Sequence, residues 1–547
     1  MAEAAQEYQF APHERPVFPG SPYSPRHSTP RKVAYAISAL LIGLASGLGN
    51  GLITVNITTI AGELGLYQNE ASWMLVVYVA FSATANLLLV KARIEFGIPR
   101  VAYTLLLALI VAELIGFAFP SFGMVLVARA IAGITNGGLT SLVLYNLFQV
   151  FPPSARPKAL MIGFTIPQLA VPVARLIPVE NVGAHGWLGL HLVETGMALI
   201  AFAALNLVPL PPTDRQKAFE PMDAVTIALA VPAMLLLCSV LAFGRTLWWT
   251  DTPWLGWALI ACMPLFALMV LIEHQRRNPL LHIEWLGSLE ILRFAAIALL
   301  IRIALAEQTY GAVGLLTAGG LTNDQLHTLF LYVLLATIAG TLTAVILVKP
   351  ERLTYMVLAA TLIIALSAWM DSYATNLTRP QQLYVSQCLV AFGSSLFLGP
   401  ALLHGFGRMM AQGPTHLVSF VVLFSTTQNI GGLAGSALLG SYQTAHARAH
   451  AEALAERLSL GDPLVVQRIQ AGARSLGLVI TDPVQAQAQG SALVAQALQR
   501  EANILAFNDT FRFVMWIALS TALYLAYIII IRRFRPLAGP APAGAKS

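Results

Sequence analysis

The sequence predicts an all-α integral membrane protein that crosses the bilayer fourteen times, with both termini in the cytoplasm. Of its 547 residues, 57% are hydrophobic and 11% are charged, and the mean hydropathy is +0.70. In soluble domains about a quarter of the residues are charged. Apolar runs of about 20 residues, enough for a helix to cross about 30 Å of hydrocarbon, recur along the chain. Basic residues gather in every second loop, which is typical of short cytoplasmic loops.

The expected spanning helices follow from the apolar runs. They cover residues 33–57, 71–90, 101–119, 122–147, 157–177, 186–208, 222–243, 253–273, 290–314, 325–348, 352–370, 382–406, 415–440 and 509–532. The basic residues of the alternate loops and ends are Arg31, Lys32, Lys91, Arg93, Arg100, Arg156, Lys158, Arg215, Lys217, Arg276, Arg277, Lys349, Arg352, Arg408, Arg532, Arg533 and Arg535. A missed or additional helix would invert this alternation downstream, so the charges favour an even count.

The two ends of the chain carry the composition of tails. Residues 1–32 are rich in proline, serine and charge and predict a disordered cytoplasmic tail, and residues 533–547 predict a second one. The first 32 residues lack the layout of a signal peptide, so the first helix is expected to act as an uncleaved export signal.

One outer loop, residues 441–508, is long and polar. Asp462-Pro463 and Asp482-Pro483 each place a capping carboxylate before a first-turn proline, which indicates helix starts. We expect two or three short helices here, the first at residues 446–458. They form either a helical cap on the outer mouth or a docking surface for a periplasmic partner.

The sequence shows no pattern for covalent chemistry. It contains no P-loop, HExxH, paired CxxC or GxSxG motif, and Cys238, Cys262 and Cys388 lie singly in apolar runs. We therefore expect no enzymatic activity, catalytic residue, cofactor, disulfide or metal site. The basic residues form no aromatic-studded face, so nucleic acid is not an expected partner. Membrane lipid and a small-molecule substrate are the expected partners.

Charged residues inside the spans are the most informative feature, because each costs about 2.5–3.5 kcal/mol at mid-bilayer. They are Glu113, Arg129, Arg175, Glu194, Arg302 and Glu307. Their depths predict that Arg175 pairs with Glu194, either as a static ion pair or in substrate or proton handling. His191 precedes Glu194 by three residues on one helix face and is either a proton-relay partner or a packing residue. Glu113, near an outer helix end, either reaches toward water or has a function.

Small and amide side chains also mark the spans. Gly43, Gly47 and Gly51 lie one turn apart and predict close approach of a neighbouring helix. Asn50 faces either that contact or a central cavity. Gln428 and Asn429 either line the cavity or bond across helices.

Two adjoining motifs carry a family resemblance. They are Arg129-Ala-Ile-Ala-Gly133-Ile-Thr-Asn136-Gly137-Gly138 and Phe151-Pro152-Pro153-Ser-Ala-Arg156-Pro-Lys158-Ala159. The first resembles the RxxQGxGxGG signature and the second the PPxxRxKA loop of the major facilitator superfamily, specifically the fourteen-helix drug:proton antiporters of the EmrB/QacA type. Supporting motifs are Trp73-x4-Tyr78, Asn278-Pro279-Leu280 and Ala506-Phe507-Asn508-Asp509-Thr510-Phe511. The resemblance runs from about residue 40 to 532.

The resemblance implies two six-helix bundles, residues 33–208 and 290–532, joined by residues 209–289 with two inserted helices. Rocking of the bundles would open a central cavity to each side in turn. It also implies that Arg129 takes part in proton coupling, and that Gly133, Gly137 and Gly138 allow close helix packing.

The sequence departs from that family at three places. Helix 1 has Gly49-Asn50-Gly51 where the family usually has an acid. Helix 5 has Val171-Pro172-Val173-Ala174-Arg175 instead of GPxxGG, which keeps the bending proline and replaces the glycines that pack on helix 11. The loop Lys91-Ala92-Arg93-Ile94-Glu95-Phe96-Gly97 is a degraded GxLADRxGRK, so its conformational latch is weaker or differently built.

The leading hypothesis is a proton-driven exporter of amphipathic or organic compounds in a bacterial inner membrane, with protons and a periplasmic adaptor protein as further partners. The proton-coupling candidates are Arg129, Glu194, Glu307, Glu113 and His191. The candidates for the substrate cavity are Asn50, Asn136, Arg175, Arg302, Gln428 and Asn429. Two intramembrane arginines favour an anionic substrate over a cationic dye. The alternatives are a facilitator or importer of an organic anion and a non-transporting membrane scaffold or sensor.

Overall fold

The computed structural model describes residues 14–16, 20–119, 121–177, 188–458, 461–476, 480 and 482–534. Apart from one isolated bridge between Pro22 and Thr213, the regular structure of these residues is helical. The predicted all-α fold class is therefore confirmed. Residues 1–13 and 17–19 of the expected N-terminal tail, and residues 535–547 of the expected C-terminal tail, lie outside the described residues.

The first half of the chain folds into helices that follow the apolar runs. They are α1 Thr29–Glu63, α2 Gln68–Phe96, α3 Ile98–Ala118, α4 Phe122–Val150, α5 Arg156–Thr165, α6 Ala170–Arg175 and α7 Leu188–Leu207. A 3-10 segment, Ile166–Leu169, separates α5 from α6 and contains Pro167. A proline cannot donate the backbone hydrogen bond of an α-helix, so the expected fifth span is broken there, one turn before Pro172.

The second half begins with two helices that pack on each other, α8 Pro221–Phe243 and α9 Pro253–Gln275. The remaining helices are α10 Ile283–Leu286, α11 Leu289–Ala304, α12 Val313–Ala318, α13 His327–Leu347, α14 Leu353–Asp371, α15 Tyr384–Gln412, α16 Leu417–Glu456, α17 Pro463–Leu476 and α18 Pro483–Phe534. A π-helical segment, Glu307–Ala312, lies between α11 and α12.

Among the described residues, thirteen helices are long and apolar enough to cross a membrane. The expected span at 290–314 is not one of them, because the π-helical segment divides it into α11 and α12. The count of fourteen spans and the cytoplasmic termini remain predictions. π-helical turns inside helices frequently occur at functional sites, and this one begins at Glu307.

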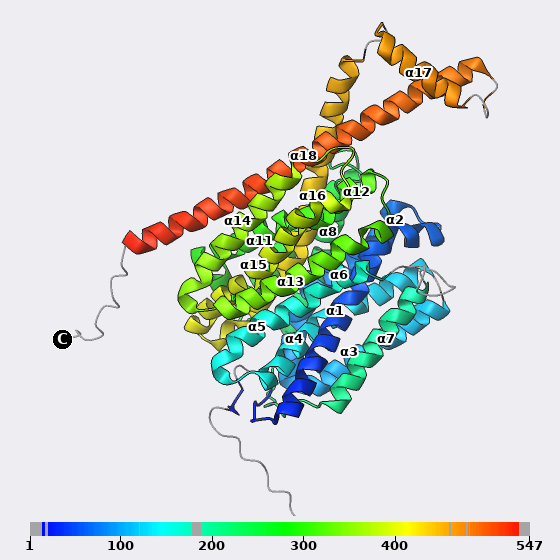
Figure 1. Ribbon diagram of the computed structural model, residues 1–547. Helices are drawn as coiled ribbons and strands as arrows, with labels where there is room; N and C mark the ends of the chain where they lie inside the picture. The colour runs from blue at the N-terminus through cyan, green and yellow to red at the C-terminus, as the bar shows by residue number, and fades with distance from the viewer. Residues whose placement is uncertain are drawn as a thin grey trace, which may run out of the picture.

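The helices contact one another in two groups (Figure 1). In the first, α2 and α3 pack on α4, α1 packs on α4, α6 and α7, and α3 packs on α7. In the second, α15 packs on α13 and α14, and α18 packs on α14 and α16. α8 touches α2 of the first group and α16 of the second, and α5 contacts α15 and α13.

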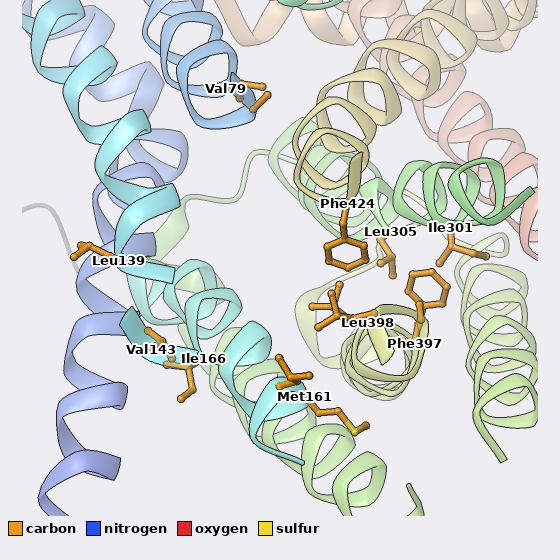
Figure 2. Close-up of a cluster of buried hydrophobic side chains, with 14 of the residues drawn as sticks. Val79, Leu139, Val143, Met161, Ile166, Ile301, Leu305, Phe397, Leu398 and Phe424 are labelled. Carbon is orange, nitrogen blue, oxygen red and sulfur yellow. The ribbon is translucent and has the colours of Figure 1, made fainter. Parts of the chain in front are cut away.

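Apolar side chains from both groups form the buried core. Figure 2 shows Leu305, Leu398 and Phe424 together between α11, α15 and α16, whereas Val143 and Ile166 lie together on the other side. Because lipid is as apolar as these side chains, tight packing rather than burial from water holds such helices together.

Glycines set the closest helix contacts. A Cβ at Gly47 would lie 2.6 Å from the carbonyl oxygen of Pro167, and one at Gly43 would lie 2.3 Å from Cγ2 of Ile166. Gly51 faces Ala170 and Ala174 in the same way. The glycine face of α1 therefore lies directly against the broken fifth span.

The glycines of α4 are equally close to their neighbours. A Cβ at Gly133 would lie 2.6 Å from the carbonyl oxygen of Tyr78, one at Gly137 would lie 3.0 Å from Cβ of Ala85, and one at Gly138 would lie 2.4 Å from Cδ1 of Leu105. The close packing expected from the α4 motif is present, against α2 and α3.

The long outer loop differs from its prediction. The expected helix at residues 446–458 is not separate, because α16 continues without a break to Glu456, and α18 runs from Pro483 into the last span. The helix starts are confirmed: Asp462 accepts the backbone N–H of Leu464, and Asp482 that of Val484, both at 2.9 Å. The C-terminal end of α16 and the N-terminal end of α18 project from the helical body together with α17 (Figure 1).

The prediction of a disordered tail is wrong for residues 20–28. Ser21 is buried, and the backbone N–H of Tyr23 donates to the carbonyl of Pro212 at 3.1 Å. Gln149, at the end of α4, donates to the carbonyl of Tyr23 at 3.0 Å and contacts the ring of His27 at 2.9 Å. This segment packs against the ends of the spans, where backbone hydrogen bonds outweigh its loop-like composition.

Candidate functional site: a buried charge cluster beside a central cavity

The first site element is an ion cluster sealed among α1, α3, α4 and α7. Arg129 Nη2 donates to Glu194 Oε2 at 2.6 Å and to Glu113 Oε1 at 3.3 Å, and its Nη1 donates to the carbonyl of Gly49 at 3.2 Å. The side chains of Arg129, Glu113 and Glu194 are 1%, 0% and 4% exposed. The cluster therefore satisfies three intramembrane charges at once, as their cost requires.

His191 completes this cluster. Its Nδ1 lies 2.5 Å from Glu113 Oε2, and it shares α7 with Glu194. The sequence placed His191 beside Glu194 as a relay, but in the structure the histidine contacts Glu113. One guanidinium, two carboxylates and one imidazole in contact can hold one more or one fewer proton without any side chain leaving the cluster.

Glu194 fills the space that an acid on helix 1 would occupy. A Cβ at Gly49 would lie 2.8 Å from Glu194 Oε2. The carboxylate of Glu194 on α7 therefore fits only because residue 49 has no side chain. Of the two acids in the spans that are candidates to replace the missing helix 1 acid, Glu194 and Glu307, Glu194 is the one that lies against this stretch of α1.

The predicted ion pair between Arg175 and Glu194 is wrong. Arg175, at the end of α6, donates from Nη1 to Asn323 Oδ1 at 2.9 Å, and its guanidinium lies 4.8 Å from the ring centre of Phe330. Asn323 in turn donates to the carbonyl of Arg175 at 3.3 Å. Comparable depth in the sequence was not enough to define a partner, because α6 faces α13 rather than α7 at this point. Arg175 is also absent from the residues that line the main cavity.

A second buried cluster lies in the other helix group. Gln387 on α15 donates from Nε2 to Glu307 Oε1 at 2.9 Å and to Asp371 Oδ2 at 2.7 Å. Two carboxylates joined by one amide, with no basic side chain bonded to either of them in the described part of the chain, can share a proton that relieves their repulsion. Sequence analysis missed Asp371, because it follows directly on the predicted end of its span at residue 370.

A cavity of about 270 Å³ lies between the two helix groups. Asn50, Asn136, Arg302, Gln428 and Asn429, all predicted as cavity residues, line it. The role of each remains a prediction, but the structure brings the five together from α1, α4, α11 and α16. Arg93 and Leu417, near the predicted cytoplasmic ends of α2 and α16, also line the cavity, so it extends toward that side.

The polar groups of the cavity are partly satisfied. Asn136 donates to Ser82 at 3.1 Å, Asn429 to the carbonyl of Ser425 at 3.0 Å, and Arg302 Nε to the carbonyl of Gln428 at 3.2 Å. Room for Arg302 comes from a glycine pair on α16: a Cβ at Gly431 would lie 2.8 Å from its Cγ, which is tighter than real contacts allow.

The charge of the cavity wall is one-sided. Its described lining holds two arginines, Arg93 and Arg302, and no carboxylate. Nε and Nη1 of Arg93 are buried without a hydrogen-bond partner, although its guanidinium lies 5.9 Å from the ring centre of Tyr145. The remainder of the wall is largely aromatic and aliphatic, with Phe164, Phe406, Phe420 and Phe424 among its members. Such a wall suits an organic molecule that carries negative charge.

A small void connects the ion cluster with the cavity wall. It measures about 20 Å³, and Glu194 lines it together with Gly49. Asn50, Tyr78 and Asn136 line both this void and the main cavity. A space of this size holds about one water molecule, and the shared side chains place Glu194 next to the cavity wall.

The degraded loop between α2 and α3 has its own set of ion pairs. Lys91 Nζ lies 2.7 Å from Asp223 Oδ2, and Arg276 Nη2 contacts both Asp223 Oδ1 and Glu220 Oε2 at 2.8 Å. The hydrogen bonds from Arg276, and then from Asn278, lower the pKa of the Glu220 carboxyl below its ordinary value. Asp223 on α8 thus joins Lys91 of α2 with Arg276 at the end of α9, and the weaker or differently built latch remains a prediction.

Comparison with known proteins supports the family suggested by the motifs. The family model described as Major Facilitator Superfamily matches residues 39–436. The uncharacterized MFS-type transporter YhcA of Bacillus subtilis is 21% identical over 91% of this chain and 93% of its own length. A multidrug resistance protein B homolog of Mycobacterium tuberculosis is 27% identical over 43% of this chain and 44% of its own length.

Solved structures show the same fold at low identity. A bacterial homologue of the human drug peptide transporters PepT1 and PepT2 superposes with a TM-score of 0.55 at 12% identity, covering 92% of this chain and all of the other. The proton:xylose symporter XylE superposes with a TM-score of 0.52 at 12% identity, covering 92% and 97%.

The two buried arginines are expected to differ in their effect on stability. Arg129→Ala leaves two sealed carboxylates without their cation, which typically costs about 3–5 kcal/mol. Arg302→Ala removes a charge that has no carboxylate partner among the described residues, so the melting temperature should stay the same or rise. Thermal unfolding of the purified variants in detergent measures both. A loss for Arg302→Ala as large as that for Arg129→Ala would contradict this assignment of the charges.

Proposed function

Because the chain belongs to the Major Facilitator Superfamily, we propose that it is a proton-coupled exporter of amphipathic organic compounds, and that organic anions are its preferred class. The family consists of transporters, so the protein is a multi-pass membrane transporter and not an enzyme. The proposal adds direction, coupling ion and substrate class, and places the protein in the plasma membrane of a bacterium as a member of the fourteen-helix drug:proton antiporters.

One observation carries the coupling: a proton-binding group and the cavity share a wall. Glu194 lies behind Asn50, Tyr78 and Asn136, across a void of about 20 Å³. A proton that reaches Glu194 removes one of the two charges that hold Arg129. Because Arg129 and Glu194 both contact Gly49, next to Asn50, a change in the cluster moves the part of α1 that borders the cavity.

The cavity supports the proposed direction. It reaches the predicted cytoplasmic ends of α2 and α16, so a compound from the cytoplasm or the inner leaflet can enter it. On the predicted outer side, Arg175 and Asn323 join α6 to the segment before α13. Export requires this outer contact to open after loading, and protons then enter from the outside.

The second acid pair gives the other bundle a proton site. Glu307 opens the π-helical segment and is joined through Gln387 to Asp371. Release of a shared proton would leave two negatively charged carboxylates bonded to the same amide. Their repulsion favours a shift of the segment between α11 and α12. Since Arg302 precedes that segment on α11, such a shift acts on the cavity wall.

Proton coupling is tested by flux of a fluorescent arylsulfonate into proteoliposomes with an acidic lumen. Molecules inserted with the cytoplasmic face outward should concentrate the probe inside. Glu194→Gln and Glu307→Gln should each lower this accumulation about tenfold or more, because the neutral amide cannot exchange a proton. Glu452→Gln, at an exposed position on the projecting end of α16, serves as the matched control and should transport normally.

The same vesicles separate the competing mechanisms. Uptake that stops when the probe concentrations are equal and is unchanged when an ionophore collapses the pH gradient, in wild type and variants alike, indicates facilitated diffusion. Accumulation only with an alkaline lumen indicates import. Either result would overturn proton-driven export.

Substrate charge is tested by Arg302→Gln. Loss of a charged hydrogen bond to an anion should weaken arylsulfonate binding by about 1.5–3 kcal/mol, or roughly tenfold to a hundredfold. Binding of a rhodamine cation should stay equal or improve. Arg468→Gln, exposed on α17, is the control and should leave both affinities unchanged. Equal losses for anion and cation would show that Arg302 supports the cavity's shape and not its charge preference.

The projecting helices are the proposed docking surface for a periplasmic adaptor protein. Leu464 at the start of α17 and Val484 at the start of α18 are 72% and 75% exposed, so they offer apolar contacts to a partner on this surface. Deletion of residues 445–500 should abolish co-purification of a crosslinked adaptor from native membranes. Leu464→Asp with Val484→Asp should do the same while leaving the melting temperature unchanged. An adaptor that is retained by both variants would exclude this surface.

A further inference from the structure

Two histidines and one aspartate meet where the ends of α16 and α18 leave the helical body. His446 and His450 lie one helical turn apart on α16, and Asp509 lies on α18. Asp509 Oδ2 is 2.9 Å from His446 Nδ1 and 2.7 Å from His450 Nε2. The three candidate ligand atoms all lie within 4.8 Å of one another.

We propose that this cluster is a binding site for a divalent transition-metal ion of the zinc class, supplied from the outer compartment. Histidines at positions i and i+4 of one helix present two nitrogen ligands on one face, which is the spacing of helical zinc sites. A carboxylate from a second helix supplies the third ligand, and water the fourth. The sequence predicted no metal site, because Asp509 is 59 residues from His450 and outside any local motif.

The present distances suit metal entry. Ligands that are each about 2.0–2.1 Å from a tetrahedral zinc ion lie about 3.3 Å apart. The two nitrogen–oxygen distances are a few tenths of an ångström shorter, as hydrogen bonds should be in the absence of a cation. Metal binding would lengthen the two nitrogen–oxygen distances by this amount and place the two histidine nitrogens, which now lie within 4.8 Å of each other, at a similar spacing. The side chains of His446, His450 and Asp509 are 38%, 32% and 19% exposed, so an ion can reach them from solution.

Neighbouring side chains hold the ligands in place. Arg512 Nη1 donates to Asp509 Oδ1 at 3.2 Å, which leaves Oδ2 directed at the histidines. The ring of Tyr442 stacks on His446 with centroids 4.1 Å apart, and Phe513 stacks on Tyr442 with centroids 4.6 Å apart. Such outer contacts fix ligand orientation in metal sites and are worth about tenfold to a hundredfold in affinity.

The bound ion would clamp the two projecting helices. α16 and α18 are the last two spans of one bundle, so the clamp does not bridge the two halves that rock. It stabilises the base of the projection that carries α17. The site therefore stands independently of the proposed export function, and its failure would leave that function untouched.

The test is Zn²⁺ binding to the full-length protein in detergent with every affinity tag removed, by calorimetry and by the rise of melting temperature with Zn²⁺. One ion per chain is expected. His446→Ala and His450→Ala should each raise the dissociation constant about tenfold or more. His327→Ala is the matched control, because this histidine also faces a carboxylate on the same side, Asp324 at 3.5 Å, but has no second histidine. It should bind Zn²⁺ like the wild type.

A ligand rescue separates coordination from structure. His450→Cys keeps a metal ligand at the same position but loses the imidazole, so it should restore the affinity lost in His450→Ala. With Co²⁺ it should also show a thiolate-to-cobalt absorption band that the wild type lacks. Zn²⁺ binding that is equal in wild type and in His446→Ala/His450→Ala, or a Cys variant without that band, would overturn the proposal.

Discussion

The contact of Arg129 with Glu194 and Glu113 is the constraint on which the first bundle depends. Each of these groups would cost several kcal/mol alone inside a bilayer, and together they are sealed from solvent. The cluster also draws in the backbone of α1, through the carbonyl of Gly49. Four helices are thus fixed relative to one another by a polar centre, in surroundings where apolar contact with lipid is as favourable as contact with protein. The buried charge cluster therefore specifies the relative position of these helices, which apolar packing alone does less strictly.

The two bundles differ in how their buried arginine and acids are arranged, and the cavity lies between the bundles. The first compensates its buried arginine with two acids, whereas the second places Arg302 on the cavity wall and keeps its acids, Glu307 and Asp371, on another network. The cavity meets Arg302 from the second half and Arg93 from the first, while the small void that Glu194 lines adjoins the wall of the first half. In the proposed mechanism, substrate charge and proton charge are handled by separate groups on the two sides of Asn50, Tyr78 and Asn136, so one can influence the other without competing for the same residue.

Sequence reasoning identified most of the elements but not their partners. The apolar runs and the glycines of α1 and α4 were predictable because helix length and close approach are local properties. The partner of Glu194 was not, since Arg129 and Arg175 both lie at accessible depths and only the rotation of each helix decides between them. Asp371 was missed because it lies one residue beyond the predicted end of its span. At such a boundary the sequence does not distinguish a polar residue that ends the helix from a buried one. Residues 20–28 were misjudged because disorder was inferred from composition, whereas their backbone groups find partners at Pro212 and Gln149.

The contact of Arg175 with Asn323 and Phe330, which joins the two halves, is weaker than an ion pair would be. Arg175 meets Asn323, a neutral partner, and the face of Phe330, rather than a carboxylate. A hydrogen bond of this kind contributes about 1.5–3 kcal/mol, and a cation–π contact about 0.5–2 kcal/mol. Freeing a buried arginine from a carboxylate pair would cost more, about 3–5 kcal/mol. Had Arg175 paired with Glu194, its charge would have been compensated within its own bundle. Placed against Asn323, it joins the bundles by a free energy comparable to what binding of a substrate or a proton can supply, as the proposed transport cycle requires of a contact that opens.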